Sequence, residues 1–169
     1  PESTSFEAII QHHLEPEIYS LKGLLSFIKL ARLKNLKNYP IHIKIDTGMH
    51  RLGFEEQQLP ELIKLLNESH TVEVKSILSH MATSDDLKFA DFAQKQIQLF
   101  EKLSHQLMKE LAIQPFRHIL NTSGISNYPK AQYDMVRLGI GLYGVSNDRE
   151  EQKYLENVST LKSVISQIR

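Results

Sequence analysis

The sequence predicts an α/β fold in which helices cover a parallel sheet. Short apolar runs rich in β-branched residues alternate with longer stretches in which apolar residues recur at helical spacing. Polar side chains also follow nearly every apolar run at the point where the run ends. Strands that alternate with helices of about 12 or more residues form βαβ units, whose strands run parallel. The sheet is therefore expected to belong to a doubly wound domain or to part of a (β/α)8 barrel.

About five strands are predicted from these short apolar runs. The second one stops abruptly at the polar residues Asp46, Thr47 and Gly48, as a buried strand does when its C-terminal edge carries polar chemistry. The last is a strand or the start of one, and it ends at Arg137. The predicted strands span residues 17–20, 41–46, 72–79, 116–120 and 134–137.

Three helices are predicted between the first four strands, at residues 21–36, 55–69 and about 87–113. Pro60 suits an early position in the second helix, where its missing N–H costs nothing. Ser84, Asp85 or Asp86 is expected to cap the third helix. The residues of the third helix that are expected to face inward are Phe89, Phe92, Ile97, Phe100, Leu103 and Leu107.

The placement of polar residues favours the barrel over the doubly wound sheet. No GxGxxG motif follows any predicted strand, so a dinucleotide-binding sheet loses support. Barrel enzymes assemble their sites from the C-terminal ends of strands and the loops that follow. Reactive side chains lie at those positions here, namely Asp46, Arg51, His80, Asn121, Thr122 and Arg137. We therefore expect a partial TIM-type barrel.

Composition excludes several classes of protein. The 169 residues, 41% of them hydrophobic, suffice for one ordinary domain. The 20 basic residues balance the 20 acidic ones, which argues against a nucleic-acid partner. Without cysteine there is no disulfide and no thiolate site. No apolar run approaches the roughly 20 residues of a membrane span, and the N-terminus lacks a signal-peptide pattern. These features predict a cytoplasmic protein with no membrane partner.

Both ends of the sequence read as cuts, so the predicted barrel is truncated at both ends. The chain begins without methionine, and its last residues alternate apolar and polar side chains in the manner of a strand cut short. A polar stretch at residues 146–157 marks a possible boundary. We expect residues 1–150 to be the C-terminal part of a barrel domain and residues 151–169 to begin a second, β-rich domain.

Two polar corners point to an anionic ligand. Residues 137–144 contain three glycines, whose backbone N–H groups can approach an anion closely. Residues 121–124 (Asn-Thr-Ser-Gly) add hydroxyl and amide donors near an expected helix start. Each corner alone is more simply a turn with capping residues. Together, on neighbouring strand ends, they favour a ligand that carries phosphate.

Four motifs in order resemble those of bacterial alanine racemases, which are fold-type III pyridoxal 5'-phosphate (PLP) enzymes. Residues 44–53 (KIDTGMHRLG) resemble the family pattern KxDTGMxRxG, and residues 79–85 (SHMATSD) resemble THFAxAD. Residues 118–122 (HILNT) resemble HxxNS, with threonine in place of serine. Residues 134–144 (DMVRLGIGLYG) resemble (D/N)MVRxGIxxYG. The ordered set covers residues 41 to 144 and is far more specific than any one motif.

The resemblance implies roles for residues at the first two motifs. Arg51 corresponds to the arginine that hydrogen-bonds the phenolic oxygen of PLP. Lys44 corresponds to a lysine that is carbamylated in many members and holds that arginine in place. Carbamylation requires a neutral amine, which burial favours; otherwise Lys44 is a strand lysine paired with a carboxylate. His80 corresponds to the histidine that stacks on the pyridine ring, unless it is a structural histidine.

The later motifs imply a phosphate shell and a partner for the pyridine nitrogen. Asn121 and Thr122 correspond to cofactor and phosphate contacts, with Gly139 and the backbone N–H of Ile140 beside them. Arg137 corresponds to the arginine that faces the pyridine nitrogen. An arginine cannot accept the proton of that nitrogen, so the ring withdraws electrons less strongly than it does beside a carboxylate. Arg137 could instead pair structurally with Asp134 or another acid.

The resemblance also shows what the chain lacks. The family lysine that bonds covalently to PLP lies in a motif such as AVxKAxAYGHG, which is absent here. The catalytic tyrosine, contributed by the partner subunit's C-terminal domain, has no counterpart either. No residue of this chain is therefore expected to be catalytic, and the isolated chain is expected to be inactive, because racemisation needs a base on each face of the α-carbon.

The expected parent is a homodimeric, cytoplasmic isomerase that converts L-alanine and D-alanine for peptidoglycan synthesis. Three other functions remain open. A PLP-dependent amino-acid decarboxylase would carry an acid where Arg137 stands. A binding barrel could keep the cofactor shell without catalysis. A hydrolytic metal site is weakly suggested by His42, His50 and His80 with Asp46, although their spacing matches no known ligand pattern.

Overall fold

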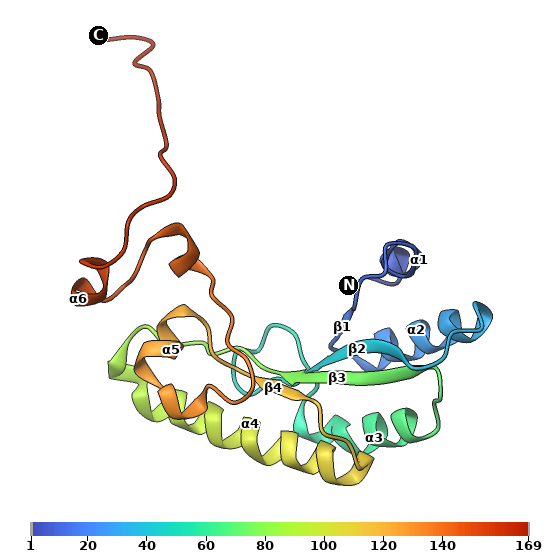
Figure 1. Cartoon of the computed structure of the whole chain (residues 1–169). Helices are drawn as coiled ribbons and strands as arrows, with labels where there is room; N and C mark the ends of the chain where they lie inside the picture. The colour runs from blue at the N-terminus through green and yellow to red at the C-terminus, as the bar shows by residue number, and fades with distance from the viewer. Residues whose placement is uncertain (1, 169) are drawn as a thin grey trace.

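The fold is a four-stranded parallel sheet with helices in the connections (Figure 1). The computed structural model describes residues 2–168, so Pro1 and Arg169, at the two expected cuts, lie outside the described residues. The strands are β1 (Glu17–Ile18), β2 (Tyr39–Lys44), β3 (Val72–Leu78) and β4 (Phe116–His118). They lie in the order β1-β2-β3-β4, and every neighbouring pair is parallel. The predicted α/β class is confirmed.

The three predicted helices are confirmed, and each begins at a local signal. Ser20 caps the first by accepting a hydrogen bond from the Gly23 N–H, and Pro60 lies in the first turn of the second. Asp86 caps a short 3-10 turn that leads into the third. The helices are α1 (Phe6–Gln11), α2 (Leu21–Leu33), α3 (Leu59–Asn67), α4 (Ala90–Leu111), α5 (Thr122–Asn127) and α6 (Arg149–Gln152). Turns of 3-10 helix span Ser3–Ser5, Glu56–Gln58, Leu87–Phe89, Pro129–Ala131 and Ile140–Tyr143.

Two of the six residues predicted to face inward from the third helix are exposed. Phe89 is 52% exposed and Phe92 is 39% exposed. Phe89 belongs to the 3-10 turn before α4, whose tighter winding takes it out of phase with the helix. Phe92 precedes the buried stripe of α4 and lies beside it. That stripe consists of Ala93, Gln96, Ile97, Phe100, Leu103, Ser104 and Leu107.

The strand order favours a barrel segment over a doubly wound sheet. A doubly wound sheet reverses its strand order and carries helices on both faces. Here the order follows the sequence without reversal, and α2, α3 and α4 follow one another along the same face of the sheet (Figure 1). Parallel strands in sequence order, with helices in an outer layer, are the repeating pattern of the (β/α)8 barrel.

The two faces of the sheet differ sharply in chemistry. Successive residues of a strand point to opposite faces, and in β2 the isoleucines Ile41 and Ile43 are buried against the helices. The alternate residues His42 and Lys44 point to the opposite face. The register pairs His42 with Ser76, so the second face continues across the sheet. It carries a polar row made of Glu17, His42, Lys44, Ser76 and His118.

The predicted fifth strand is wrong. Residues 134–137 run beside β4 and donate two hydrogen bonds toward it, from Asp134 N–H to the Arg117 carbonyl and from Arg137 N–H to the Leu120 carbonyl. No regular ladder forms, because the Arg117 N–H donates its hydrogen bond to the Asp134 carboxylate. In a ladder it would donate to a backbone carbonyl of the neighbouring strand. The left-handed backbone of Tyr133, with φ at 46°, also turns the chain immediately before this segment.

The predicted strand near the C-terminus is not formed either. Residues 155–168 have no regular structure, and their apolar side chains are exposed, with Leu161 at 99% and Val164 at 91%. This segment extends away from the sheet in Figure 1. Strand alternation needs a neighbouring strand to become a ladder, and none of the described residues supplies one.

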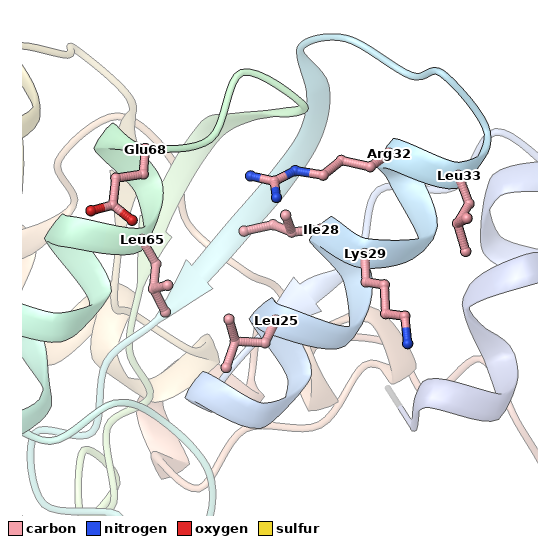
Figure 2. Close-up of a pocket in the computed structure, with 7 residues that line it drawn as sticks. All are labelled: Leu25, Ile28, Lys29, Arg32, Leu33, Leu65 and Glu68. Atoms are coloured by element: carbon pink, nitrogen blue, oxygen red, sulfur yellow. The ribbon is translucent and has the colours of Figure 1, made fainter.

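A cavity of about 600 Å³ lies between α2 and α3, away from the strand ends (Figure 2). Leu25, Ile28 and Leu65 form its apolar floor, while Arg32 and Glu68 stand at its rim. None of the predicted site residues lines it. Among residues 2–168, no helix combines the length and the apolar character that crossing a bilayer would require.

Candidate functional site

Thr122 joins the two polar corners that the sequence singles out. It is the first residue of α5, the helix that follows β4, and its side-chain oxygen accepts hydrogen bonds from the backbone N–H groups of Gly139 at 2.9 Å and Gly141 at 3.2 Å. The contact is close, since a Cβ on Gly141 would lie 2.8 Å from the Thr122 methyl carbon. A hydroxyl that accepts two hydrogen bonds keeps one proton to donate. The corner therefore retains a donor for a further acceptor.

The side chain of Asn121 stabilises the same corner. Its side-chain oxygen accepts from the Gly124 N–H at 3.1 Å and from the Ser84 hydroxyl at 2.6 Å. The first contact caps α5, and the second ties α5 to the loop after β3. Asn121 therefore shapes the corner, and its oxygen is already occupied by these two donors.

A cavity of about 370 Å³ opens at the carboxyl ends of the strands. Its size falls within the roughly 300–1,000 Å³ typical of small-molecule sites. It brings together five residues predicted from the sequence, namely His80, Asn121, Thr122, Gly139 and Ile140. Met49, Met81, Ala82, Ser84, Asp85, Ser123 and Asn147 complete the lining. The predicted gathering of strand-end residues is thus present in the fold.

His80 lies on the loop after β3, and Gln96 of α4 fixes that loop. The Gln96 amide donates to the His80 carbonyl at 3.2 Å and accepts from the Ala82 N–H at 2.9 Å. Burial lowers the pKa of His80, and the charges of Arg137, Lys44 and Arg51 lower it further, while Glu17 opposes them. A histidine with a lowered pKa is neutral at pH 7, which leaves an uncharged imidazole facing the cavity.

Arg137 is held by the ends of β3 and β4. One guanidinium nitrogen donates to the Ser79 carbonyl at 2.6 Å and to the Ile119 carbonyl at 3.3 Å, and it lies 3.5 Å from His80 Nδ1. The other donates to His118 Nδ1 and to the His118 carbonyl. Burial lowers the pKa of Arg137, and Glu17 opposes this, but an arginine stays charged in a protein. The predicted alternative, a pair with Asp134, is not the arrangement seen.

The buried imidazole of His118 is kept uncharged by its surroundings. Burial, followed by the charges of Arg137 and His42, lowers the pKa of His118 from 6.5 to about 4. Only 4% of the residue is exposed. The neutral ring accepts from Arg137 through Nδ1, and its Nε2 lies 3.1 Å from the Ser76 hydroxyl.

This lowered pKa predicts a loss of stability in acid. The unfolded chain binds a proton at His118 near pH 6.5, while the folded chain binds it near pH 4. The stabilisation is therefore complete above pH 6.5 and is lost as the pH falls toward 4. Urea unfolding between pH 7 and 4 should show a decrease of up to about 3 kcal/mol from this group. A His118→Gln variant should lose less over that range, and equal slopes for the two proteins would contradict the assignment.

Lys44 and Arg51 are not in contact with each other. The Lys44 ammonium lies 3.4 Å from a Glu17 carboxylate oxygen, and its side chain is 11% exposed. This is the carboxylate pair that the sequence left as the simpler alternative for Lys44. Arg51 is exposed in the loop after β2 and forms no hydrogen bond or ion pair within residues 2–168. That loop is nevertheless anchored, because Phe54 N–H donates to the Lys44 carbonyl at 2.8 Å.

Sequence reasoning missed two residues that organise the site. Gln96 interrupts the apolar stripe of α4 yet is 1% exposed, and a polar residue at such a helical position is a usable signal. Ser76 bridges two histidines from different strands, and no local pattern marks it. The weak metal hypothesis relies on three histidines and an aspartate; across residues 2–168, no group of three potential ligands is close enough to hold a metal.

Fold and site together define a class of protein. A parallel sheet in sequence order, helices along one face, and a small-molecule cavity at the carboxyl ends of the strands are the features of ligand-binding α/β barrels. Residues 1–147 match the family model described as "Alanine racemase, N-terminal domain". The chain belongs to this family.

Known relatives agree with the family match. The chain is 34% identical to an alanine racemase from Carboxydothermus hydrogenoformans, over 96% of the chain and 44% of that relative. A solved alanine racemase from Clostridium difficile 630 superposes with a TM-score of 0.81 at 28% identity, over 93% of this chain and 41% of that one. An alanine racemase from Bartonella henselae with covalently bound pyridoxal phosphate gives a TM-score of 0.74 at 30% identity, over 87% and 41%. The chain spans under half the length of these relatives.

Proposed function

We propose that this chain forms one wall of the PLP site of an alanine racemase. The parent protein is taken to be a polypeptide that carries this chain together with the remaining length of its relatives. The observation that carries the proposal is the cavity at the strand ends, where residues from all four family-like motifs line one space. Family membership supplies the reaction class, and the cofactor bound in the Bartonella henselae relative supplies the ligand.

The corner at Thr122 fits the phosphate of PLP. Its hydroxyl has a proton left to donate, because its oxygen already accepts from Gly139 and Gly141. Ile140 opens a 3-10 helix, so its backbone N–H precedes the first hydrogen bond of that helix. A phosphate oxygen accepts from both kinds of donor. Thr122 and Ile140 would therefore hold the phosphate at the rim of the cavity, with Gly139 beside them bonded to Thr122.

His80 and Arg137 fit the ring. The neutral imidazole of His80 lines the cavity, and the Arg137 guanidinium lies 3.5 Å from His80 Nδ1. Bound PLP supplies an electron-withdrawing ring that stabilises negative charge at the α-carbon of an amino acid. Arg137 would donate to the pyridine nitrogen and, being unable to accept its proton, would leave that nitrogen unprotonated. This limits electron withdrawal, which suits racemisation more than decarboxylation or transamination.

Lys44 and Arg51 would support the cofactor from β2. Arg51 would reach the phenolic oxygen of PLP once the loop closes over the ligand. Lys44 would steady it after carbamylation, in which the neutral amine adds carbon dioxide and releases a proton, giving an anionic carbamate able to accept from arginine. Without carbamylation, the Lys44 ammonium forms an ion pair with the Glu17 carboxylate. Mass spectrometry of the parent protein in bicarbonate tests for the added carboxyl group.

The remaining features of the parent follow from the same proposal. It would be a cytoplasmic homodimer that acts on alanine, and the D-alanine it forms would serve peptidoglycan synthesis. Residues 1–150 would belong to its barrel and residues 151–169 would begin its β-domain. The lysine that bonds PLP and the catalytic tyrosine would come from outside this chain, so the chain alone would not racemise alanine.

Replacing Thr122 by valine is expected to weaken PLP binding to the parent protein about tenfold, the effect of losing one charge-assisted hydrogen bond. Equilibrium dialysis with PLP measures the dissociation constant. Thr122→Ser keeps the hydroxyl and should bind as the unchanged protein does. Ser126→Ala, which removes an exposed hydroxyl from the same helix, is the matched control. Equal affinities for Thr122→Val and Ser126→Ala would place the phosphate elsewhere.

A further inference from the structure

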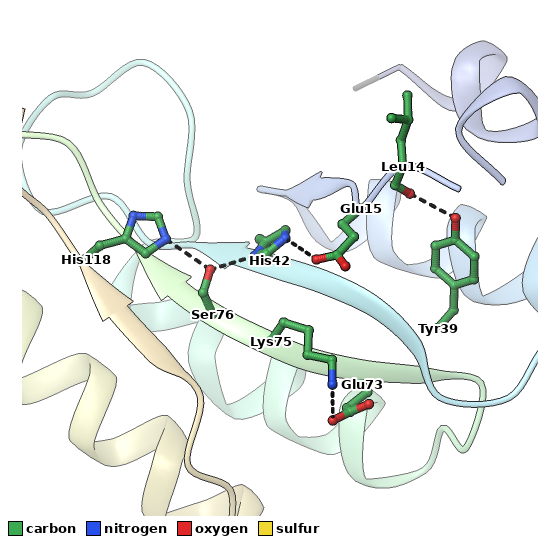
Figure 3. Close-up of polar contacts among 8 residues, drawn as sticks. All are labelled: Leu14, Glu15, Tyr39, His42, Glu73, Lys75, Ser76 and His118. Atoms are coloured by element: carbon green, nitrogen blue, oxygen red, sulfur yellow. Dashed lines mark hydrogen bonds and ion pairs between the residues drawn. The ribbon is translucent and has the colours of Figure 1, made fainter. Parts of the chain in front are cut away.

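A chain of hydrogen bonds crosses the polar face of the sheet from the surface to Arg137. Glu15, before β1, lies 2.9 Å from His42 Nε2, and His42 Nδ1 lies 2.7 Å from the Ser76 hydroxyl. The same hydroxyl lies 3.1 Å from His118 Nε2, and His118 Nδ1 contacts Arg137. Figure 3 shows the run from Glu15 to His118, with the Ser76 side chain between the two imidazoles.

Strand register places these side chains on one line. His42 of β2 pairs with Ser76 of β3, and His118 of β4 pairs with Leu78, two residues further along β3. Residues two apart point to the same face of a sheet, so the three side chains share that face. Ser76 is 1% exposed and His118 is 4% exposed, so water does not replace these contacts. Glu15 at the outer end is 47% exposed.

Glu15 and Arg137, at the two ends of this series of hydrogen bonds, fix the direction of each hydrogen bond between them. Arg137 has only donors, so His118 Nδ1 must accept, and the proton of the neutral His118 ring must lie on Nε2. His118 Nε2 then donates to Ser76, and the Ser76 hydroxyl donates to His42 Nδ1. His42 Nε2 donates to the Glu15 carboxylate, which can only accept. A single assignment of protons satisfies all four contacts.

We infer that Ser76 is a positioning residue. Its hydroxyl joins His118 to His42 in one series of hydrogen bonds and thereby holds the His118 ring with its Nδ1 toward Arg137. The inference rests on the proposed function, in which Arg137 faces the pyridine nitrogen of PLP. Without the hydroxyl, His118 Nε2–H and His42 Nδ1 both lose their partner. Arg137 still requires an unprotonated Nδ1 on His118, so the Nε2 proton is left without an acceptor and the ring is held from the Arg137 side alone.

The test is the protonation pattern of the histidines in the 169-residue chain without cofactor. Long-range proton–nitrogen NMR on histidine labelled with ¹⁵N distinguishes a protonated ring nitrogen from an unprotonated one. At pH 7.5, His118 and His42 should each carry their proton on Nε2. Ser76→Ala should shift the ¹⁵N resonances of His118 Nε2 and His42 Nδ1, which lose their hydrogen bonds, and Ser76→Thr, which keeps the hydroxyl, should retain the original resonances. Ser104→Ala, which removes another buried hydroxyl, on α4, should leave both histidines unchanged.

Two outcomes would overturn the inference. One is a proton on His118 Nδ1 in the unchanged chain, which also decides the matter if Ser76→Ala fails to fold. The other is a Ser76→Ala spectrum in which the ¹⁵N resonances of both histidines are unchanged. Neither readout involves PLP, so failure here is distinct from failure of the proposed function. If the parent protein did not bind PLP, the proposed function would be wrong, and the result on the histidines would be unaffected.

Discussion

Replacing Arg137 by methionine is expected to lower the free energy of unfolding by about 3 kcal/mol, because the guanidinium is buried and serves several backbone carbonyls at once. The carbonyls of Ser79 and Ile119 and the Nδ1 of His118 would lose their donor together. These groups end β3 and β4, so the loss falls on the strands that frame the cavity. Urea unfolding followed by circular dichroism measures the change.

Arg51→Met is the matched control for this substitution. Arg51 belongs to the same predicted cofactor shell, but it is exposed and has no hydrogen-bond partner within residues 2–168. Its replacement should change the free energy of unfolding by less than about 0.5 kcal/mol. Equal losses for the two variants would mean that Arg137 is not held as described. Both variants should impair the PLP-dependent reaction of the parent protein, so the free energy of unfolding is the measurement that distinguishes them.

Replacing Gly53 by alanine is expected to cost more than about 3 kcal/mol, since the new Cβ would meet backbone atoms that cannot move independently. Gly53 has a φ of +140°, and its Cβ would lie 2.5 Å from Asp46 N and 2.8 Å from Ile45 C. At this point the loop that carries Arg51 returns to β2, where Asp46 N–H donates to the Phe54 carbonyl at 2.9 Å. The substitution would therefore displace the loop as well as lower stability, as thermal unfolding would show.

Gly23→Ala supplies the control for Gly53→Ala. Gly23 is in the first turn of α2, where alanine has the higher helix propensity. The nearest atom to its Cβ would be the Ser20 hydroxyl oxygen at 3.1 Å, and a side-chain oxygen can shift by a few tenths of an ångström. We expect Gly23→Ala to be neutral or slightly stabilising. If the Gly53→Ala and Gly23→Ala proteins had the same melting temperature, that result would contradict the close approach of Gly53 to the backbone of Asp46.

Most of the fold could be predicted from local patterns. The early Pro60 and the spacing of buried residues in α4 each act over a few neighbours, so the sequence displays them directly. Residues 134–137 misled the prediction for a non-local reason. A strand requires a partner ladder, and here the Asp134 side chain takes the backbone donor of Arg117 that would have completed it.

The candidate site was predictable where it follows the ends of strands. His80, Thr122 and Arg137 were found in this way, because parallel strands bring their carboxyl ends to one edge. The bridge through Ser76 was not predictable, since it depends on register between three strands far apart in sequence. The separation of Lys44 from Arg51 was also invisible, because the tip of a loop is not fixed by the pattern of its own residues.

Racemisation of alanine by the parent protein tests the central proposal most directly. With PLP and L-alanine, the parent protein should form D-alanine, and the isolated 169-residue chain with the same additions should form none. Chiral chromatography of the amino acid, with parallel detection of released carbon dioxide, separates the possible reactions. Carbon dioxide without D-alanine would indicate a decarboxylase, and PLP binding without either product would indicate a binding protein. Either result, or D-alanine formed by the isolated chain, would contradict the proposal that this chain is one wall of a racemase site.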